Sequence, residues 1–347
     1  MTKSADTPNL VDVKKLRRSL LRWYKQNRRD LPWRRTSDPY RIWVSEIMLQ
    51  QTRVAAVLDH YARFIRRFPT VRTLAAARES SVLTAWSGLG YYNRARRMHE
   101  AARLITRKRG GEFPRTAEEW SKLPGVGRYT AAAVASIAFG EPIAAVDGNV
   151  ERVLARVFGR KREREAAWKQ AEMLLDRTRP GDFNQAMMEL GATVCAPTAP
   201  QCGLCALNRW CKSHGAGPMR PQAARQRKRL YYALVRRVND VLLVQRPADA
   251  SLMAAMWELP VILDSEPNGN DLLVRLRHSI TNTDYEVCII SMAPDHLQLP
   301  NGGARWFSRR QWERLPLTGL ARKVLRLVAS DIEANESKHL RYAEEIQ

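Results

Sequence analysis

Four of the five cysteines lie close together and could bind a metal centre. Cys195, Cys202, Cys205 and Cys211 are separated by six, two and five residues. Thiolates on such short loops can surround one compact centre, and soft sulfur ligands select zinc or an iron–sulfur cluster. The spacing alone does not distinguish the two. The fifth, Cys288, stands in an apolar run and is interpreted as a small buried hydrophobe.

Two carboxylates stand where acid–base chemistry is possible. On a predicted helix, Glu46 shares a face with Trp43 and Leu49. Loss of water there would raise its pKa, so that it could act as a general acid near neutral pH; the alternative is a solvated helix glutamate. Asp147 precedes another predicted helix. It is either a helix N-cap or an ionised carboxylate facing a sugar that develops positive charge.

A glycine-rich turn precedes an alanine-rich helical segment over 131–138. Backbone N–H groups of such a turn, and of the helix start behind it, can point at an anion such as a DNA phosphate. The alternative is a turn that only connects two helices. The DNA-contacting residues predicted here are Leu123, Gly125, Val126, Gly127 and Arg128.

The net charge of the chain indicates what kind of molecule it binds. The chain has 347 residues, 58 Lys and Arg against 35 Asp and Glu, and a formal net charge of +23. This surplus predicts a polyanionic partner, and nucleic acid is favoured over a membrane surface because no apolar run approaches the roughly 20 residues of a spanning helix. The N-terminal residues show no secretory signal, so we expect a cytoplasmic protein, associated with the nucleoid when it acts on DNA.

The elements that must position these residues divide into two domains. Apolar residues recur at helical spacing from about 11 to 190, which predicts an all-α domain over 1–211 with the cysteine loop at 195–211. A basic linker follows over 212–229, then a smaller α/β domain over 230–330 and a polar tail over 331–347. In the second domain we expect strands over 231–235, 241–244 and 285–291, the first two joined as a hairpin at 239–240, and helices over 271–277 and 320–328.

The cysteine spacing and the glycine turn together resemble the endonuclease III-like helix–hairpin–helix superfamily of DNA glycosylases. Further motifs resemble the MutY family of adenine DNA glycosylases within it. They are residues 31–34, 46–52, 88–92, 147–149 and 183–188. The resemblance implies a [4Fe–4S] cluster on the four cysteines. It also implies double-stranded DNA with adenine opposite 8-oxoguanine or guanine as the substrate, a monomer, and an abasic-site endonuclease acting downstream.

The resemblance also implies a role for each site residue. Glu46 would protonate N7 of a flipped adenine and Asp147 would stabilise the oxocarbenium-like sugar, while Tyr129 and Asn149 hydrogen-bond the two carboxylates. Relatives that also cut the strand carry a lysine at position 129, so Tyr129 predicts a monofunctional hydrolase. The DNA-contacting residues that the resemblance adds are Arg34, Gln51, Thr52 and Tyr91.

The second domain resembles a Nudix-like domain at residues 256–260 and 315–320. It has no run of metal-binding carboxylates between 260 and 278, so it should bind and not hydrolyse. In the family this domain recognises 8-oxoguanine with a Phe-Ser-His loop, where this chain has Ile280, Thr281 and Asn282. Thr281 keeps a hydroxyl, so the resemblance implies that it contacts the lesion. Two alternatives stay open, namely a mismatch thymine glycosylase, which also carries tyrosine at position 129, and a non-catalytic iron–sulfur protein that senses DNA damage.

Overall fold

The structure is a computed structural model that describes residues 10–214, 225–237, 240–250, 253–262, 272–280, 283–297 and 303–328. The chain divides into two compact units. The first comprises Met1–Ala76 with Arg97–Pro221, and the second comprises Ala77–Arg96 with Gln222–Gln347. No helix in the described ranges has the length and apolar character needed to cross a bilayer.

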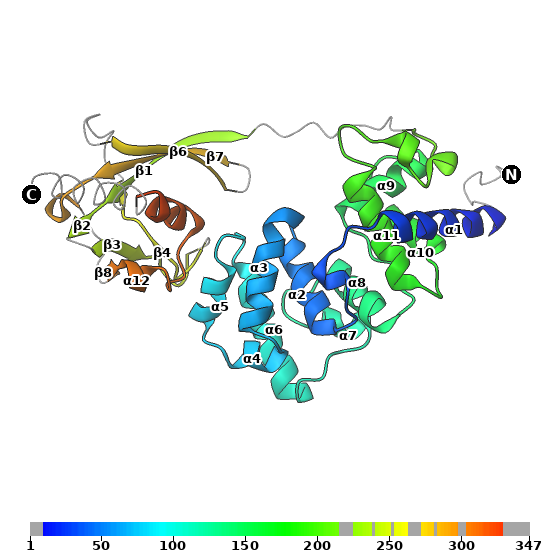
Figure 1. Ribbon diagram of the computed structural model, residues 1–347, viewed down its shortest axis with the longest axis horizontal. Helices are drawn as coiled ribbons and strands as arrows, with labels where there is room; N and C mark the ends of the chain where they lie inside the picture. The colour runs from blue at the N-terminus through cyan, green and yellow to red at the C-terminus, as the bar shows by residue number, and fades with distance from the viewer. Residues whose placement is uncertain are drawn as a thin grey trace, which may run out of the picture. The chain divides into compact units, whose positions relative to one another are not determined.

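The first unit is helical, and none of its described residues up to 214 forms a strand, which confirms the predicted all-α character (Figure 1). Proline and glycine set several of the helix ends, since α3 ends before Pro69 and α11 begins at Pro180. The helices are α1 (Leu10–Asn27), α2 (Pro39–Leu49), α3 (Val54–Arg67), α4 (Val71–Ala76), α6 (Asn93–Arg109, which begins in the second unit), α7 (Ala117–Ser121), α8 (Arg128–Phe139), α9 (Gly148–Phe158), α10 (Arg164–Leu174) and α11 (Pro180–Thr193), with the 3-10 turns η1 (Pro32–Arg34), η2 (Cys202–Leu204) and η3 (Asn208–Trp210).

Helix α8 is the centre of the first unit because its small side chains allow close packing. Residues 131–135 are four alanines and a valine, all fully or almost fully buried, and α8 contacts α2, α7 and α11. Helix α9 packs on α11 so closely at Gly191 that a Cβ atom there would lie 2.7 Å from Cβ of Asn149. This packing brings the start of α9 beside α8 and α11.

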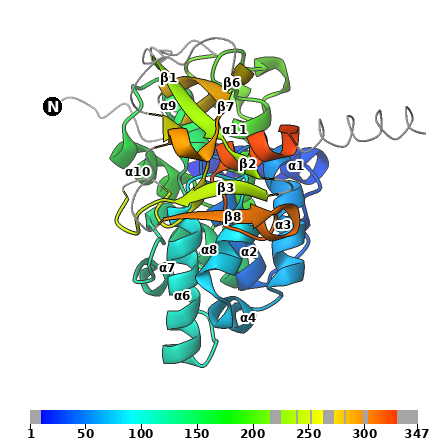
Figure 2. The ribbon, with the colours of Figure 1, turned by 90° about the vertical axis from the view of Figure 1, so that its left-hand side faces the viewer.

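The second unit contains two four-stranded sheets around one helix. The first sheet has the order β5-β1-β7-β6, and in the second β3 pairs with β2, β4 and β8. Figure 2 shows β3 and β8 side by side. A helix over 319–328 lies between the two sheets (Figure 1), and its buried apolar side chains share one core with both. The elements are α5 (Glu79–Trp86), β1 (Gln226–Leu234), β2 (Arg236–Arg237), β3 (Asp240–Gln245), β4 (Trp257–Glu258), β5 (Val261–Ile262), β6 (Leu272–Ile280), β7 (Thr283–Ser291), η5 (Pro294–His296), β8 (Ala304–Ser308) and α12 (Arg309–Trp312).

One expectation about the second unit is wrong, and another holds in part. Residues 271–277 were expected to be helical, but 272–280 form strand β6. Val274 and Leu276 alternate with Arg275 and Arg277, a period of two that suits an antiparallel strand beside β7. The strands expected at 231–235 and 241–244 exist, and an antiparallel hairpin forms at the expected turn, where Arg236 pairs with Val241 and the N–H of Leu242 donates to the carbonyl of Val235. The part of the first strand before Val235 belongs to a different sheet. Strand β1 pairs in parallel with β7 in one sheet, while the short β2 pairs with β3 in the other.

The strand over 285–291 and the helix over 320–328 are confirmed within β7 and the helix over 319–328. Strand β1 begins at Gln226, so the last residues of the expected linker over 212–229 are part of a sheet. The expected tail over 331–347 lies outside the described residues.

Candidate active site

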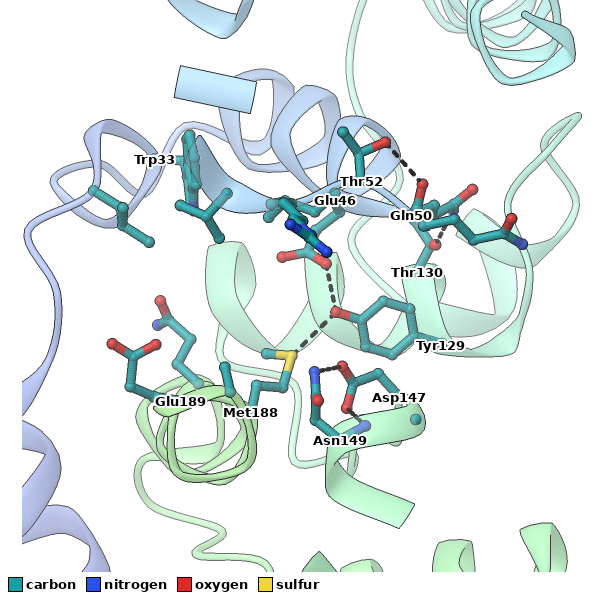
Figure 3. A pocket seen from close by; sticks show the side chains of 18 of the residues that line it. Trp33, Glu46, Gln50, Thr52, Tyr129, Thr130, Asp147, Asn149, Met188 and Glu189 are labelled. Carbon is teal, nitrogen blue, oxygen red and sulfur yellow. Dashed lines mark hydrogen bonds between the residues drawn. The ribbon is translucent and has the colours of Figure 1, made fainter. Parts of the chain in front are cut away.

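A cavity of about 810 Å³ opens in the first unit where α2, α8, α9 and α11 meet (Figure 3). Most of the site residues predicted for this unit line it, although they come from segments far apart in the sequence. These lining residues are Arg34, Glu46, Gln51, Thr52, Gly125, Gly127, Arg128, Tyr129, Asp147 and Asn149. Leu123 and Val126 belong to the same turn as Gly125 but are not part of the lining.

Glu46 projects from α2 and is buried, with a hydrogen bond to Tyr129 at the start of α8. The Tyr129 hydroxyl donates to Oε2 of Glu46 at 2.6 Å and also lies 3.0 Å from Sδ of Met188 (Figure 3). Burial raises the pKa of Glu46 to about 7, and the nearby carboxylate of Asp147 adds to the rise. The hydrogen bond from Tyr129 and the charge of Arg34 oppose it. The carboxyl can therefore hold a proton at neutral pH.

Asp147 is the N-cap of α9, and its carboxylate accepts three hydrogen bonds. Oδ1 accepts from the backbone N–H groups of Asn149 at 2.9 Å and Val150 at 2.8 Å, and Oδ2 accepts from Nδ2 of Asn149 at 2.9 Å (Figure 3). Burial raises the pKa of Asp147, while these donors favour the ionised form. The two interpretations of this residue are compatible, because the carboxylate that caps the helix also lines the cavity.

A buried ion-pair network forms another wall of the cavity, and the sequence analysis missed its central residue, Glu189. This side chain has no exposed surface and accepts hydrogen bonds from Arg29 and Arg34, at 2.6 Å and 2.8 Å from Oε2. These contacts hold the pKa of Glu189 at about 2 despite its burial. Its position between Met188 and Leu190, in an otherwise apolar helical run, is the sequence feature that could have identified it as a site residue. Arg34 is thus held inside the unit, and its contact with DNA stays a prediction.

The glycine turn leaves the N-terminus of α8 without a side chain that caps its backbone N–H groups. Gly125 has φ +75°, and a Cβ atom there would lie 2.5 Å from Cβ of Arg97, so only glycine fits. Gly127 is the N-cap of α8, with no side chain capping the helix and nothing within 4 Å of a hypothetical Cβ atom. Beside this turn, Arg128 stacks 3.9 Å from the centroid of the Trp168 ring and pairs with Glu165 at 3.1 Å. The turn has the open helix N-terminus that an anion site requires.

The remaining predicted DNA contacts lie in three places. Gln51, just after α2, has φ 56° and an exposed side chain, and it lines the cavity with Thr52. Tyr91 belongs to the second unit, where it is 45% exposed with φ 48° and lies beside the Arg94 guanidinium. Thr281 lies outside the described residues.

The cysteine loop is fixed to the first unit by Arg156 of α9. Its guanidinium donates to Sγ of Cys195 at 3.2 Å, to the carbonyl of Ala196 at 2.7 Å and to that of Pro197 at 2.9 Å. Among the described residues, no group of three or more His, Cys, Asp or Glu side chains is arranged to hold a metal ion.

The thiols are nevertheless near enough to interact electrostatically. Burial raises the pKa of Cys205 to about 11, and the thiols of Cys195, Cys211 and Cys202 contribute to the rise. A cationic centre would offset this cost, because coordinated thiols are deprotonated. Four thiols on one anchored loop are a donor set suited to an iron–sulfur centre.

Comparisons with known proteins agree with this geometry. Residues 44–177 match the family described as HhH-GPD superfamily base excision DNA repair protein. The chain is 36% identical to an adenine DNA glycosylase of Rattus norvegicus over 92% of this chain and 79% of the relative. It is 48% identical to that of Homo sapiens over 59% of this chain and 40% of the relative.

Solved structures resemble the first part of the chain. A thermostable thymine-DNA glycosylase matches with a TM-score of 0.55 and 34% identity, over 59% of this chain and 97% of that one. Endonuclease III in a non-covalent complex with DNA matches with a TM-score of 0.51 and 26% identity, over 58% and 96%. The helical fold of the first unit is therefore that of DNA glycosylases.

Proposed function

The chain belongs to the adenine DNA glycosylase family, and we propose that it excises adenine paired with 8-oxoguanine, and less readily with guanine, during base excision repair. It is a DNA glycosylase with double-stranded DNA as its partner. The observation that carries the proposed mechanism is a single cavity lined both by Glu46, which can hold a proton at neutral pH, and by the Asp147 carboxylate, which caps α9.

In the proposed reaction the adenine nucleotide is flipped out of the duplex into the cavity, at a cost of a few kcal/mol. The Tyr129 hydroxyl donates its hydrogen bond to Oε2 of Glu46, whereas Oε1 makes no hydrogen bond within the described residues. A proton on Oε1 can therefore pass to N7 of adenine. Protonation makes the base a better leaving group, as the raised pKa of Glu46 allows near neutrality.

Asp147 then stabilises the positive charge that develops on the sugar as the glycosidic bond breaks. Its three hydrogen bonds hold the carboxylate in place before the reaction, so little reorganisation is needed at the transition state. Water adds to the sugar and leaves an abasic site, which an abasic-site endonuclease must process. No amine stands at position 129, so the chain itself forms no Schiff base there.

The DNA is held in this proposal by backbone contacts and by inserted side chains. The open start of α8 at Gly127 would bind a phosphate, and the exposed Gln51 and Tyr91 would enter the base stack beside the lesion. Arg128 and Thr52 would contact the DNA beside the cavity.

The four cysteines would hold a [4Fe–4S] cluster. When bound, the cluster would cross-link the loop and stabilise its structure, and it would take no part in the reaction at the base. Arg156 supports this role from the protein side, since it orders Cys195 and the two carbonyl groups that follow.

The second unit would act as a Nudix-like domain that recognises 8-oxoguanine. Ile280 of β6 pairs with Thr283 of β7, and the predicted lesion contact, Thr281, stands between these two residues in the sequence. A hydroxyl there retains one hydrogen-bonding group of the family's loop.

A single-turnover assay tests substrate, reaction and lesion preference together. Duplexes carrying adenine opposite 8-oxoguanine, adenine opposite guanine, thymine opposite guanine, and cytosine opposite 8-oxoguanine are compared for the parent chain and Glu46→Gln. We expect excision of adenine alone, fastest opposite 8-oxoguanine, and a loss of about 10²–10⁴-fold in Glu46→Gln with duplex binding retained. Excision of thymine would favour the thymine glycosylase alternative, and unchanged excision by Glu46→Gln would remove the proposed acid.

A further inference from the structure

A second, smaller cavity lies within the second unit and is strongly basic. It has a volume of about 350 Å³ and is lined by Gly88, Gly319, Arg322, Lys323, Arg326 and Leu327. Three of these side chains are cationic and none is acidic. Arg326 is four residues after Arg322 and three after Lys323 on the helix over 319–328, so its side chain neighbours both of the others on the helix surface. A small basic cavity without carboxylates suits a phosphate group.

The wall opposite this helix is the loop that carries Tyr91. Nε of Arg322 donates to Oγ of Ser87 at 2.7 Å, and the Tyr92 hydroxyl donates to the carbonyl of Leu317 at 3.2 Å. Both ends of the loop are therefore attached to the helix or to the residues just before it. Between these attachments Gly88 has φ 104°, and Tyr91 is exposed.

The helix itself is held firmly in the unit. Thr318 caps it by accepting from the backbone N–H of Ala321 at 3.2 Å, and its own N–H donates to the carbonyl of Trp257 at 2.9 Å. Arg322 also donates to the carbonyl of Leu315 at 3.1 Å, so its guanidinium is already oriented. Lys323 and Arg326 are exposed at the cavity, and in the described part of the chain the Arg326 guanidinium forms no ion pair.

We propose that this cavity binds a backbone phosphate of the DNA strand into which Tyr91 inserts. The inference rests on the proposed insertion of Tyr91 and adds a site that holds the strand beside it. Arg322 orients the loop, while Lys323 and Arg326 supply charge to the phosphate. The second unit thereby contributes to DNA affinity through the same helix that anchors the insertion loop.

The test compares two double variants that remove equal charge. K323Q/R326Q removes two of the three positive charges of the cavity and keeps Arg322. R305Q/R310Q removes two exposed arginines of β8 and α12 that do not line the cavity. Duplex affinity is measured over a range of salt concentrations. For K323Q/R326Q we expect an affinity about three- to tenfold lower at physiological salt and a log–log salt slope shallower by about 0.9, as for one lost phosphate contact. R305Q/R310Q should keep a slope close to that of the parent.

A second arm alters the DNA instead of the protein. Single uncharged methylphosphonates are placed in turn along the strand near the mispair, and affinity is measured for the parent and K323Q/R326Q. We expect one position that weakens binding of the parent but not of the variant, because the contact is already lost. Equal slopes for the two double variants, or identical methylphosphonate profiles for parent and K323Q/R326Q, would overturn the proposal. Adenine excision by the parent is scored separately at saturating enzyme. Excision by the parent with no difference between the two double variants marks failure of the site alone, whereas no excision by the parent marks failure of the enzyme function.

Discussion

The hydroxyl of Tyr129 donates a 2.6 Å hydrogen bond to Oε2 of Glu46, although the two residues are 83 positions apart in the chain. This contact stabilises the ionised carboxylate, whereas burial favours the protonated one. The balance holds the pKa of Glu46 at about 7. Tyr129 is therefore a positioning residue that both orients the proposed acid and adjusts its proton affinity.

Removing this hydroxyl should move the pH dependence of excision. In Tyr129→Phe, loss of a hydrogen bond that stabilises the ionised carboxylate raises the pKa of Glu46 further. The high-pH decline in the single-turnover rate should shift upward accordingly. Tyr24→Phe is the matched control, because Tyr24 is a buried tyrosine of the same unit whose hydroxyl makes no hydrogen bond within the described residues. An unshifted decline in Tyr129→Phe would contradict the role given to the hydroxyl.

The parent enzyme should show a bell-shaped pH profile. Glu46 must be protonated, so the excision rate constant should fall about tenfold per pH unit above about 7. Asp147 must be ionised, and burial raises its pKa, so the low-pH decline should begin above the ordinary value of 3.8. Single-turnover rates with adenine opposite 8-oxoguanine, measured from pH 4 to 9, check both limbs. A rate independent of pH between 7 and 9 would exclude Glu46 as the acid.

Substituting Asp147 by asparagine should separate its two roles. Asparagine caps helices as well as aspartate, so Asp147→Asn should change the free energy of unfolding by less than about 1 kcal/mol. Loss of the carboxylate charge should still lower the excision rate by about 10²–10³-fold. Asp147→Ala should lose a similar rate and also about 1 kcal/mol of stability. Denaturant unfolding and single-turnover assays measure the two effects, and near-parent excision by Asp147→Asn would contradict the electrostatic role.

The Glu189 network should stabilise the folded unit in a pH-dependent way. The pKa of Glu189 is about 2 in the folded protein against an ordinary 4.5, so its stabilising effect is complete above 4.5 and is lost as the pH falls toward 2. Glu189→Gln leaves Arg34 buried without its charge partner and should cost about 3–5 kcal/mol at pH 7. Denaturant unfolding of parent and variant should show this difference shrinking below pH 4.5. A difference that stays constant down to pH 3 would argue against the ion pair as its source.

Arg156 should be needed to retain the proposed cluster. In Arg156→Gln the contacts to Cys195, Ala196 and Pro197 are lost or weakened. We expect iron content to fall clearly below about four atoms per chain, with a lower melting temperature. Lys161→Gln is the control, because Lys161 is exposed and lies close to the end of α9. Full iron content in Arg156→Gln would show that the loop holds its centre without this support.

The helical part of the chain was predictable because its signals are local. Apolar spacing, Pro69 and Pro180 mark helices and their limits within a few residues, so the all-α first unit followed from pattern alone. Residues 271–277 were expected to be helical because a short run of apolar and basic residues fits the period of a helix as well as that of a strand. Pairing with β7, a tertiary contact, selects the strand. The segment 77–96 belongs to the second unit through contacts such as Ser87 with Arg322, which no local pattern indicates.

The side chains that could do chemistry are evident from the sequence, since a carboxyl, a phenol or a set of spaced thiols is a property of residue type and order. How these groups act on one another depends on the fold. The proton affinity of Glu46 depends on burial and on Tyr129, Asp147 and Arg34, which reach it from other segments of the chain. Such desolvation and charge effects depend on distance in space, and folding alone sets those distances.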